Sequence, residues 1–467
     1  MNKLISKKYD LAIIGAGVVG CAIARQAAKY ELNTILIDAA SDVGEGTSKA
    51  NTAILHTGFD MVPGSLESKL VCAGYKLLYQ YATDHNIAVE KLGGLLVAWS
   101  DEQLQALPKI LEKSIANGYT ECEIITKERL YQLEPNLGEG ALGALSVPGE
   151  WIIDPWTPII SYATQAKLAG VEIALNTKVV DIKNTDDGFD LSVTKTNFND
   201  GLASTQSICA KYLINSAGLF ADELDNLLGI DEFKVTPRRG ELIVFDKLAR
   251  SLINHVILPV PSSMGKGVLI SPTVFGNIML GPTAENLADK TATSSTNQGL
   301  ATLLEKGKKI APKLLSEEIT ATYAGLRSAT EKSDYQIKLH PNNYLTVGGI
   351  RSTGLTASLA IAEYVFELLK DSGMNLGAEK KLPDIKMNNL GEATLRPYQD
   401  EEKIVKNSNY GRIICHCEKT TYQEVVDALS SPIAPTTLGG LGRRCRAGIG
   451  RCAGFYCHAS LRKLLEK

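Results

Sequence analysis

One stretch decides the fold of this chain: YDLAIIGAGVVGCAIARQAAKY, residues 9 to 30. Its first part, Tyr9 to Ile14, is an apolar run of the length and composition of a buried strand. A glycine-rich turn follows, and the helical pattern then continues through Ala27. A second strand-like run, TILID, ends at Asp38. Strand, helix and strand in this order predict a βαβ unit, and therefore an α/β fold with parallel strands.

The glycines of this unit point to a phosphate-bearing ligand. Gly15, Gly17 and Gly20 form GxGxxG directly after the strand and at the start of the helix. The first permits the turn, the second lets a pyrophosphate approach the backbone, and the third allows close helix packing. Asp38, eighteen residues after Gly20, is placed to accept hydrogen bonds from a ribose. We therefore expect a dinucleotide site, and the pattern does not itself separate NAD from FAD.

Length and composition exclude several classes of protein. At about 150 residues per domain, 467 residues make roughly three structural units. Hydrophobic residues are 44% of the chain and the net charge is −3, so neither disorder nor a basic nucleic-acid coat is indicated. The uncharged runs at 11–24 and 267–284 are short or interrupted by glycine and proline. We expect a cytoplasmic protein with no nucleic-acid partner, and leave open peripheral contact with the inner face of the cell membrane.

The last 53 residues hold five of the nine cysteines. Cys415 and Cys417 form CxC, and Cys452 and Cys457 form Cx4C, after a polar and irregular stretch that reads as a linker. Four thiolates can close an iron–sulfur or a zinc site, and a metal centre would stabilise a segment too short for a large core. Cys445 is a fifth thiol that could replace Cys452 or Cys457. The neighbouring arginines at 443, 444, 446 and 451 could offset the cluster's charge or form a docking face.

Longer motifs carry a resemblance to a known family. They begin with GTSKAN (46–51) and AILHTG (53–58), and continue with GEWIIDP (149–155), TPRRGE (236–241), GKGVLISPT (265–273), MLGPTAE (279–285), AGLRSATEKSDY (324–335) and GGIRSTGLTAS (348–358). In this order they resemble the FAD-dependent glycerol-3-phosphate oxidase and dehydrogenase family, within the D-amino-acid-oxidase-like superfamily, over about residues 8 to 370. The tail, with RAGIGRC at 446–452, resembles the bacterioferritin-associated-ferredoxin-like [2Fe-2S] domain.

The resemblance implies a domain plan. It predicts a Rossmann-like FAD-binding domain interleaved with a β-sheet substrate domain, followed by a small Cys-rich iron–sulfur domain. We expect an oxidoreductase body at 1–384, with FAD-binding segments at about 1–90, 150–230 and 325–384. The substrate domain would then take about 91–149 and 231–324. A linker at 385–410 would lead to the [2Fe-2S] domain at 411–467.

The resemblance also implies site residues. Alcohol oxidation needs a base for the hydroxyl proton, and a neutral histidine can serve near neutral pH. His56, in AILHTG, is the predicted base at the reactive face of the flavin. Arg327 is the predicted catalytic and anion-binding cation, because a guanidinium binds phosphate bidentately, and Lys266 and Arg351 would complete the anion pocket. The predicted FAD-binding residues are Gly15, Gly17, Gly20, Asp38, Thr47, Ser48, Gly218, Gly354 and Thr356. The matching iron–sulfur domain uses Cys415, Cys417, Cys452 and Cys457, and leaves Cys445 outside.

The activity implied is oxidation of sn-glycerol 3-phosphate to dihydroxyacetone phosphate, with hydride transfer to FAD and electrons passed to a partner protein or a quinone. Two alternatives stay open. Related 2-hydroxyglutarate oxidases share the HTG and PGSL (63–66) features, so a 2-hydroxyacid or amine oxidase or dehydrogenase is one. The other is a non-catalytic electron-transfer or cluster-sensing subunit that keeps FAD as a structural element. Zinc is the alternative to the [2Fe-2S] cluster.

Overall fold

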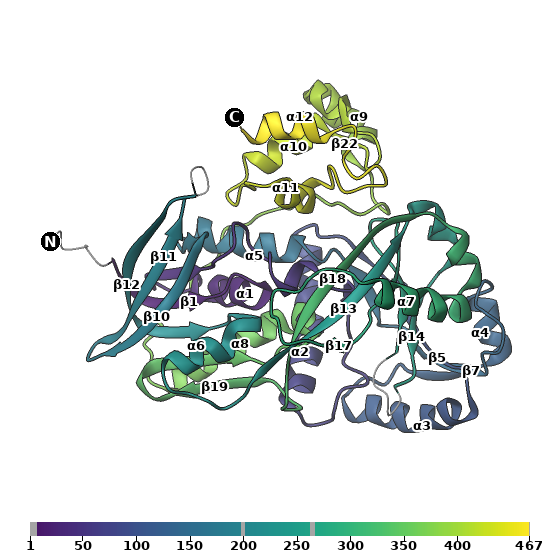
Figure 1. The fold of residues 1–467 in the computed structure, drawn as a ribbon, viewed down its shortest axis with the longest axis horizontal. Coiled ribbons are helices and arrows are strands. Elements are labelled where there is room, and N and C mark those ends of the chain that lie inside the picture. Colours follow the sequence, from purple (N-terminus) through teal and green to yellow (C-terminus); the bar gives the residue numbers. More distant parts are fainter. Residues whose placement is uncertain (1–6, 198–200, 262–266, 467) are drawn as a thin grey trace.

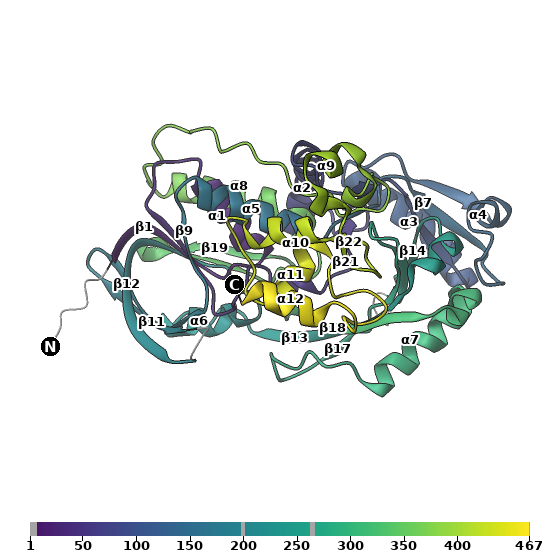
Figure 2. The ribbon, with the colours of Figure 1, turned by 90° about the horizontal axis from the view of Figure 1, so that it is seen from above.

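Two large β-sheets and a small C-terminal domain make up the molecule (Figure 1). The computed structural model describes residues 7–197, 201–261 and 267–466. Lys266, one of the predicted substrate-binding residues, lies outside the described residues. Seen from above in Figure 2, the C-terminal domain lies over the middle of the molecule, with the first sheet on one side and much of the second sheet on the other.

The first sheet grows from the predicted βαβ unit. Its central strands β1, β2 and β12 are parallel, with Leu11 paired to Thr34 on one side and to Tyr212 on the other. The sheet runs in the order β10-β11-β12-β1-β2-β9, and β20 joins β12 and β19. The strands are β1 (Lys7–Ile14), β2 (Thr34–Ile37), β9 (Glu172–Ala174), β10 (Thr177–Thr185), β11 (Gly188–Thr196), β12 (Ala203–Asn215), β19 (Gln336–His340) and β20 (Tyr344–Gly348).

Alternating side chains of β1 fill two cores. Leu11 and Ile13 belong to the core shared with the helices, whereas Ala12 and Ile14 belong to the core shared with β10, β11 and β12. The helices on the first face are α1 (Val18–Ala27), α2 (Leu66–Asp84), α5 (Thr157–Leu168) and α8 (Gly354–Asp371). Because both faces of β1 are buried, the glycine turn and the start of α1 are held at the carboxyl end of a rigid strand, where α/β sheets bind ligands.

The second sheet is largely antiparallel. Its order is β17-β13-β16-β15-β14-β5-β7-β6, and β18 pairs along the full length of β13. The strands are β5 (Gly94–Ala98), β6 (Glu123–Thr126), β7 (Gly143–Val147), β13 (Val235–Phe245), β14 (Val256–Pro259), β15 (Leu269–Pro272), β16 (Ile278–Gly281), β17 (Glu285–Asn286) and β18 (Ile319–Thr330). The other helices of the body are α3 (Asp101–Ala116), α4 (Lys127–Leu133), α6 (Ala221–Leu227) and α7 (Asn297–Ile310).

The two sheets interleave along the chain, and a small sheet lies beside them. It consists of β3 (Ile54–Leu55), β8 (Trp151–Ile153) and β4 (Val89–Glu90). First-sheet strands come from residues 7–37, 172–215 and 336–348, and second-sheet strands from 94–147 and 235–330. The predicted fold class is confirmed. The domain boundaries stay a prediction, and β18 runs across the one expected between 324 and 325.

The C-terminal domain is small and helical. It contains β21 (Ile413–Cys415), β22 (Thr420–Thr421), α10 (Tyr422–Leu429), α11 (Leu438–Cys445) and α12 (His458–Leu465), around a core that includes Val425, Leu441 and Leu461. In Figure 1, α11 forms the side of the domain that faces the body.

The predicted linker is irregular but fastened to the body. Met387 N–H donates to His85 O and Glu392 N–H donates to Val274 O. Arg396 is 1% exposed and forms ion pairs with Glu392 and Glu424, before the short helix α9 (Glu401–Lys406). The segment is therefore an ordered connection, bonded to both the oxidoreductase body and the C-terminal domain. In the described part of the chain, no helix combines the length and the hydrophobicity that crossing a bilayer requires.

Candidate cofactor and active site

A cavity of about 950 Å³ is lined by residues of both sheets. Its volume is at the upper end of the range of roughly 300–1,000 Å³ for ligand sites. Eight of the nine predicted FAD-binding residues line it: Gly15, Gly17, Asp38, Thr47, Ser48, Gly218, Gly354 and Thr356. His56, Arg327 and Arg351 line it as well. The cavity therefore brings the predicted cofactor and substrate residues to one place.

The glycine turn is too tight for side chains. Gly15 has φ +101°, and a Cβ there would lie 2.4 Å from the carbonyl oxygen of Ser216. A Cβ on Gly20 would lie 1.8 Å from the carbonyl oxygen of Gly15, which explains why Gly20 serves packing. Gly17 is the N-cap of α1 and carries no side chain, so the start of the helix stays open to a phosphate.

Asp38 is anchored at the end of β2. Its Oδ2 accepts a hydrogen bond from Ala16 N–H at 2.6 Å, and its Oδ1 accepts one from Ala40 N–H at 2.7 Å. Burial raises the pKa of this carboxyl, and the two backbone donors partly oppose the shift. The carboxylate thus ties the glycine turn to the second strand at the rim of the cavity.

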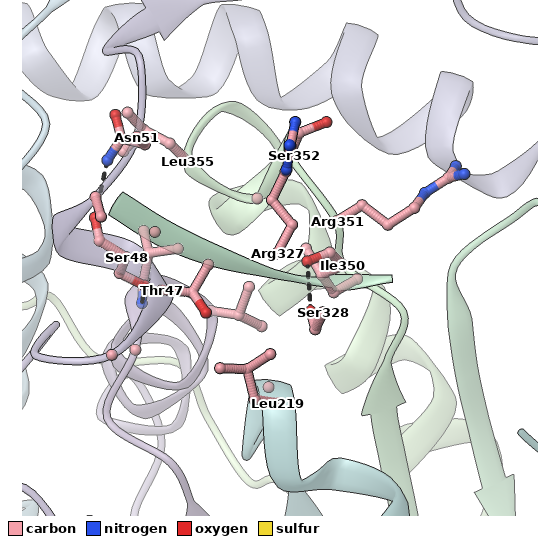
Figure 3. Close-up of a pocket in the computed structure, with 18 of the residues that line it drawn as sticks. Thr47, Ser48, Asn51, Leu219, Arg327, Ser328, Ile350, Arg351, Ser352 and Leu355 are labelled. Atoms are coloured by element: carbon pink, nitrogen blue, oxygen red, sulfur yellow. Dashed lines mark hydrogen bonds between the residues drawn. The ribbon is translucent and has the colours of Figure 1, made fainter. Parts of the chain in front are cut away.

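The loop at 46–51, whose Thr47, Ser48 and Asn51 are labelled in Figure 3, is bonded to helix α1 and to strand β18. The Thr47 hydroxyl donates to Leu326 O of β18 at 2.7 Å, next to Arg327. Ser48 Oγ accepts from Val18 N–H of α1 at 3.0 Å. Asn51 braces the loop from within by donating to Ser48 O at 2.8 Å.

These features fit FAD. Gly15 and Gly17 of the glycine turn line the cavity, and the starts of α1 and α8 both face it through Gly17 and Gly354. Thr353, the N-cap of α8, uses its hydroxyl on Glu67 and Tyr335 instead of on the helix. Two helix starts at one cavity suit a cofactor that carries a pyrophosphate and a ring that becomes negative on reduction.

His56 is held between two carboxylates. Its Nδ1–H donates to both oxygens of Glu150 at 2.9 Å, and its Nε2–H donates to Asp60 Oδ1 at 3.1 Å. Glu150 is 1% exposed and also accepts from the backbone and the hydroxyl of Thr57. The backbone N–H of His56 donates to Thr356 Oγ1, which links the histidine to α8.

This environment differs from the expected neutral imidazole. Burial alone would lower the pKa of His56, but Glu150 and Asp60 outweigh it and raise the pKa to about 10. The imidazolium is therefore the favoured form in the structure. Sequence reasoning missed both carboxylates as site residues, although Glu150 lies in GEWIIDP and Asp60 comes four residues after His56.

Arg327 brings a half-buried cation to the cavity. Its Nη2 donates to Thr283 O at 2.7 Å, and longer contacts reach the carbonyl oxygens of Arg238 and Arg239. Among the residues that the structure describes, no carboxylate forms an ion pair with it. Burial, with a contribution from the charge of Arg238, lowers the pKa of Arg327 to about 10. A guanidinium bonded to backbone carbonyls alone can still take a ligand anion.

Arg351 lines the cavity, but its guanidinium already has partners within the body. Its guanidinium donates to Glu67 Oε2 at 2.6 Å and to Ser333 O at 2.8 Å. In Figure 3 its side chain extends away from the labelled residues of the loop at 47–51. Of the two predicted substrate cations that the structure describes, Arg327 presents to the cavity a guanidinium without a carboxylate partner, whereas the guanidinium of Arg351 is paired with Glu67.

The thiols of the tail approach in two pairs. Cys417 lies next to Cys452, and Cys415 lies next to Cys457. The backbone N–H groups of Tyr456, Gly454 and Phe455 point at the Cys452 sulfur and lower the pKa of its thiol. In the described ranges no three His, Cys, Asp or Glu side chains are arranged around a single metal ion. Paired thiols with amide donors fit a two-iron cluster, whose four thiolates are shared between two irons.

Cys445 stands apart from these pairs. It is 1% exposed, packs in the core of the domain, and its thiol donates to Leu441 O at 3.3 Å. Burial raises the pKa of this thiol to about 12. This environment suits a small hydrophobic residue better than a thiolate ligand.

The tail arginines bind carboxylates in the body and within the tail. Arg444 pairs with Asp42, Arg443 with Asp42 and Glu45, and Arg451 with Asp246 and Glu318. Arg446 pairs with Glu418 of the tail and lies 4.1 Å from the centroid of the Phe275 ring. The docking face that the sequence suggested is therefore used within the chain, between the tail and the body.

The dinucleotide cavity and the paired thiols define a flavin-dependent oxidoreductase with an attached iron–sulfur domain. Comparison with known proteins makes the assignment specific. Residues 10–368 match the family model of FAD dependent oxidoreductases, and residues 413–467 match the BFD-like [2Fe-2S] binding domain. The chain belongs to this FAD-dependent oxidoreductase family, and its cofactors are FAD and a [2Fe-2S] cluster.

Individual relatives agree with this family. The chain is 35% identical to a glycerol 3-phosphate dehydrogenase of Caloramator mitchellensis over 461 residues, which cover 98% of this chain and 94% of the relative. It is 32% identical to a glycerol 3-phosphate oxidase of Mycoplasma pneumoniae, over 77% of this chain and 94% of that protein. The solved structure of the L-α-glycerophosphate oxidase of Mycoplasma pneumoniae with FAD bound superposes with a TM-score of 0.73. The two chains are 30% identical in sequence, and the superposed part covers 82% of this chain and 99% of the oxidase chain.

Proposed function

We propose that the protein is a dehydrogenase that oxidises sn-glycerol 3-phosphate to dihydroxyacetone phosphate. The observation that carries the proposal is that His56 and Arg327 line the same cavity. A phosphorylated alcohol needs a cation for the phosphate and a proton acceptor for the hydroxyl. The names of the relatives that cover most of this chain support the same substrate.

Arg327 would hold the phosphate. Its present donors face backbone carbonyls, so a phosphate gains a charge-assisted partner without breaking an ion pair within the described residues. Thr47 fixes the neighbouring Leu326 carbonyl, which sets the position of Arg327 relative to the cofactor loop.

Once the substrate takes the place of Asp60 at Nε2, His56 would release its Nε2 proton to solvent, and the neutral imidazole would then accept the hydroxyl proton. Removing one carboxylate from the ring lowers the pKa of His56 towards the neutral range, because a nearby negative charge favours the imidazolium. Glu150 would keep Nδ1–H fixed and leave Nε2 as the reacting nitrogen. When bound, FAD supplies the acceptor for the hydride that leaves the carbon.

Electrons would leave the body for a partner protein or a quinone. The [2Fe-2S] domain supports this, since a one-electron centre beside a two-electron flavin suits stepwise transfer. A cytoplasmic location, with peripheral contact at the inner face of the membrane, is part of the proposal. All nine cysteines lie in the described residues and none forms a disulfide, which supports a reducing compartment.

An anaerobic visible spectrum of the purified holoprotein tests the substrate. We expect the flavin bands to bleach with sn-glycerol 3-phosphate, and to persist with glycerol, L-2-hydroxyglutarate and glycine. Bleaching by L-2-hydroxyglutarate or glycine instead would establish the 2-hydroxyacid or amine alternative. Bands that persist with every compound would support the non-catalytic subunit and overturn the proposal.

A further inference from the structure

A buried ionic contact joins the iron–sulfur domain to the body. Arg444 on α11 binds both oxygens of Asp42, with Nη1 to Oδ2 and Nη2 to Oδ1 each at 2.8 Å. Arg443 reaches the same Oδ2 at 2.8 Å and also pairs with Glu45. Asp42 is 2% exposed and the two arginines are 8% exposed. We name Arg443, Arg444, Asp42 and Glu45 the clasp.

The helix of the tail is shaped for this contact. Arg444 is also fixed inside the tail, where Nε donates to Ile433 O at 2.9 Å and Nη1 to Gly440 O at 2.9 Å. A Cβ on Gly440 would lie 2.7 Å from Asp42 Oδ2. The glycine lets α11 approach the carboxylate, so the clasp needs the folded helix and not only its two arginines.

Asp42 lies at the start of the loop that lines the cofactor cavity. Its Oδ1 accepts from Val43 N–H, and the next residue, Gly44, donates its N–H to Ala16 O of the glycine turn at 2.8 Å. Glu45, Thr47 and Ser48 then line the cavity itself. Hydrogen bonds therefore connect Arg444 of the iron–sulfur domain, through Asp42 and the adjacent Gly44, to the glycine turn.

The charge balance makes the loop depend on the tail. Burial alone would raise the pKa of Asp42, but Arg444 and Arg443 hold it below its ordinary value. Without the arginines, a buried carboxylate would be left uncompensated and the loop would have to rearrange to hydrate it. The loop carries Thr47 and Ser48, so such a rearrangement would disturb the contacts to Leu326 and Val18.

We propose that Arg443 and Arg444 are positioning residues for the FAD-binding loop, and that tight binding of FAD requires the docked iron–sulfur domain. The proposal uses the FAD cavity alone and is independent of the substrate. It makes the C-terminal domain a structural part of the flavin site. Loss of the cluster, which loosens a domain with a small core, would then weaken FAD binding as well.

The test is the FAD affinity of the full-length protein after removal of the flavin, measured by titration with quenching of flavin fluorescence. We expect the double variant Arg443→Gln/Arg444→Gln and the single variant Asp42→Asn each to bind FAD at least tenfold more weakly. The matched control is Arg451→Gln, because Arg451 also joins the tail to the body, through Asp246 and Glu318, which do not line the cavity. We expect its affinity to stay within twofold. Unchanged affinity in Asp42→Asn and the double variant would overturn the proposal.

Cluster absorbance shows whether the tail is folded in each variant. If the double variant loses its cluster, Asp42→Asn decides the question, since its change lies in the body. A second readout is reciprocal, because coupling between two sites acts equally in both directions. Adding FAD to the flavin-free wild type should slow hydrogen exchange in α11, and identical exchange with and without FAD would contradict the proposal.

Discussion

Side chains of the same type have different partners at the cavity and away from it. His56 and His255 each face a buried glutamate, Glu150 and Glu134, at 2.9 Å and 2.8 Å. His56 lines the cavity, and its other ring nitrogen contacts Asp60. His255 lies outside the cavity lining, and its partner Glu134 also accepts hydrogen bonds from the backbone N–H groups of Asn254 and His255, just before β14. A histidine–glutamate pair is therefore no active site by itself. What sets His56 apart is access to a ligand and a second, exchangeable partner.

The largest effect should come from the histidines themselves. We expect His56→Ala to lower the rate of flavin reduction by sn-glycerol 3-phosphate about 10³-fold, within the range of roughly 10²–10⁴ for loss of a general base. His255→Ala should change it less than threefold. Anaerobic stopped-flow bleaching measures both, with FAD content as the control. Equal losses in the two variants would remove the distinction between the two histidines.

The arginines offer the second contrast. Arg327→Gln should raise KM about 10²-fold, because hydrogen bonds to charged groups contribute roughly 1.5–3 kcal/mol. Arg351→Gln should leave KM within threefold and lower the melting temperature, since Glu67 loses its ion-pair partner. Steady-state kinetics with varied substrate measure the difference. A rise in KM of more than threefold for Arg351→Gln would show that Arg351 does belong to the anion pocket.

Substitutions of Glu150 and Glu134 should distinguish a glutamate that orients the reacting histidine from one that only supports the fold. Glu150→Gln removes a charge from His56, so we expect the rate to fall about 30-fold and the acid limb of the pH profile to move to lower pH. Glu134→Gln should lower stability and leave the profile in place. Glu150→Asp should recover part of the rate with the wild-type profile. An unmoved acid limb in Glu150→Gln would show that Glu150 only supports the fold.

Asp60→Asn should have a smaller effect. One carboxylate remains on His56, so the pKa of the histidine should fall and the acid limb should move to lower pH. At pH 7 we expect the rate to change less than tenfold, because the substrate displaces Asp60 in the proposed reaction. A loss as large as that of His56→Ala would mean that Asp60 takes part in the reaction directly.

The sequence predicted what local patterns control. GxGxxG, the strand before it and Asp38 are close in the chain, and the structure brings Gly15, Gly17 and Asp38 to one cavity. The CxC and Cx4C motifs likewise predicted a metal centre, because the two cysteines of each motif are close together in the sequence. The apolar run that ends at Ile14 was enough to predict the strand that positions the turn.

The partners of the site residues could not be found in this way. Glu150 is 94 positions from His56, Glu67 is 284 from Arg351, and Asp42 is 402 from Arg444. A single charged residue in a long motif carries no signal about which distant side chain it meets. For this reason the sequence placed Arg351 in the anion pocket without indicating its partner Glu67, and it left open whether the tail arginines offset the charge of the cluster or form a docking face. Only the tertiary fold settles how such charges are paired.

The smallest expected effect is on stability at alkaline pH. The pKa of His56 is raised to about 10 in the folded protein, against about 6.5 in an unfolded chain. The charged pairing with Glu150 and Asp60 therefore stabilises the fold fully below about pH 6.5, and this contribution is lost as the pH rises through about 10. We expect the melting temperature of the wild type to fall by a few degrees more than that of His56→Gln between pH 7 and pH 10. Differential scanning calorimetry of the FAD-loaded proteins measures it, and parallel curves for the two proteins would show that the histidine is uncharged at neutral pH.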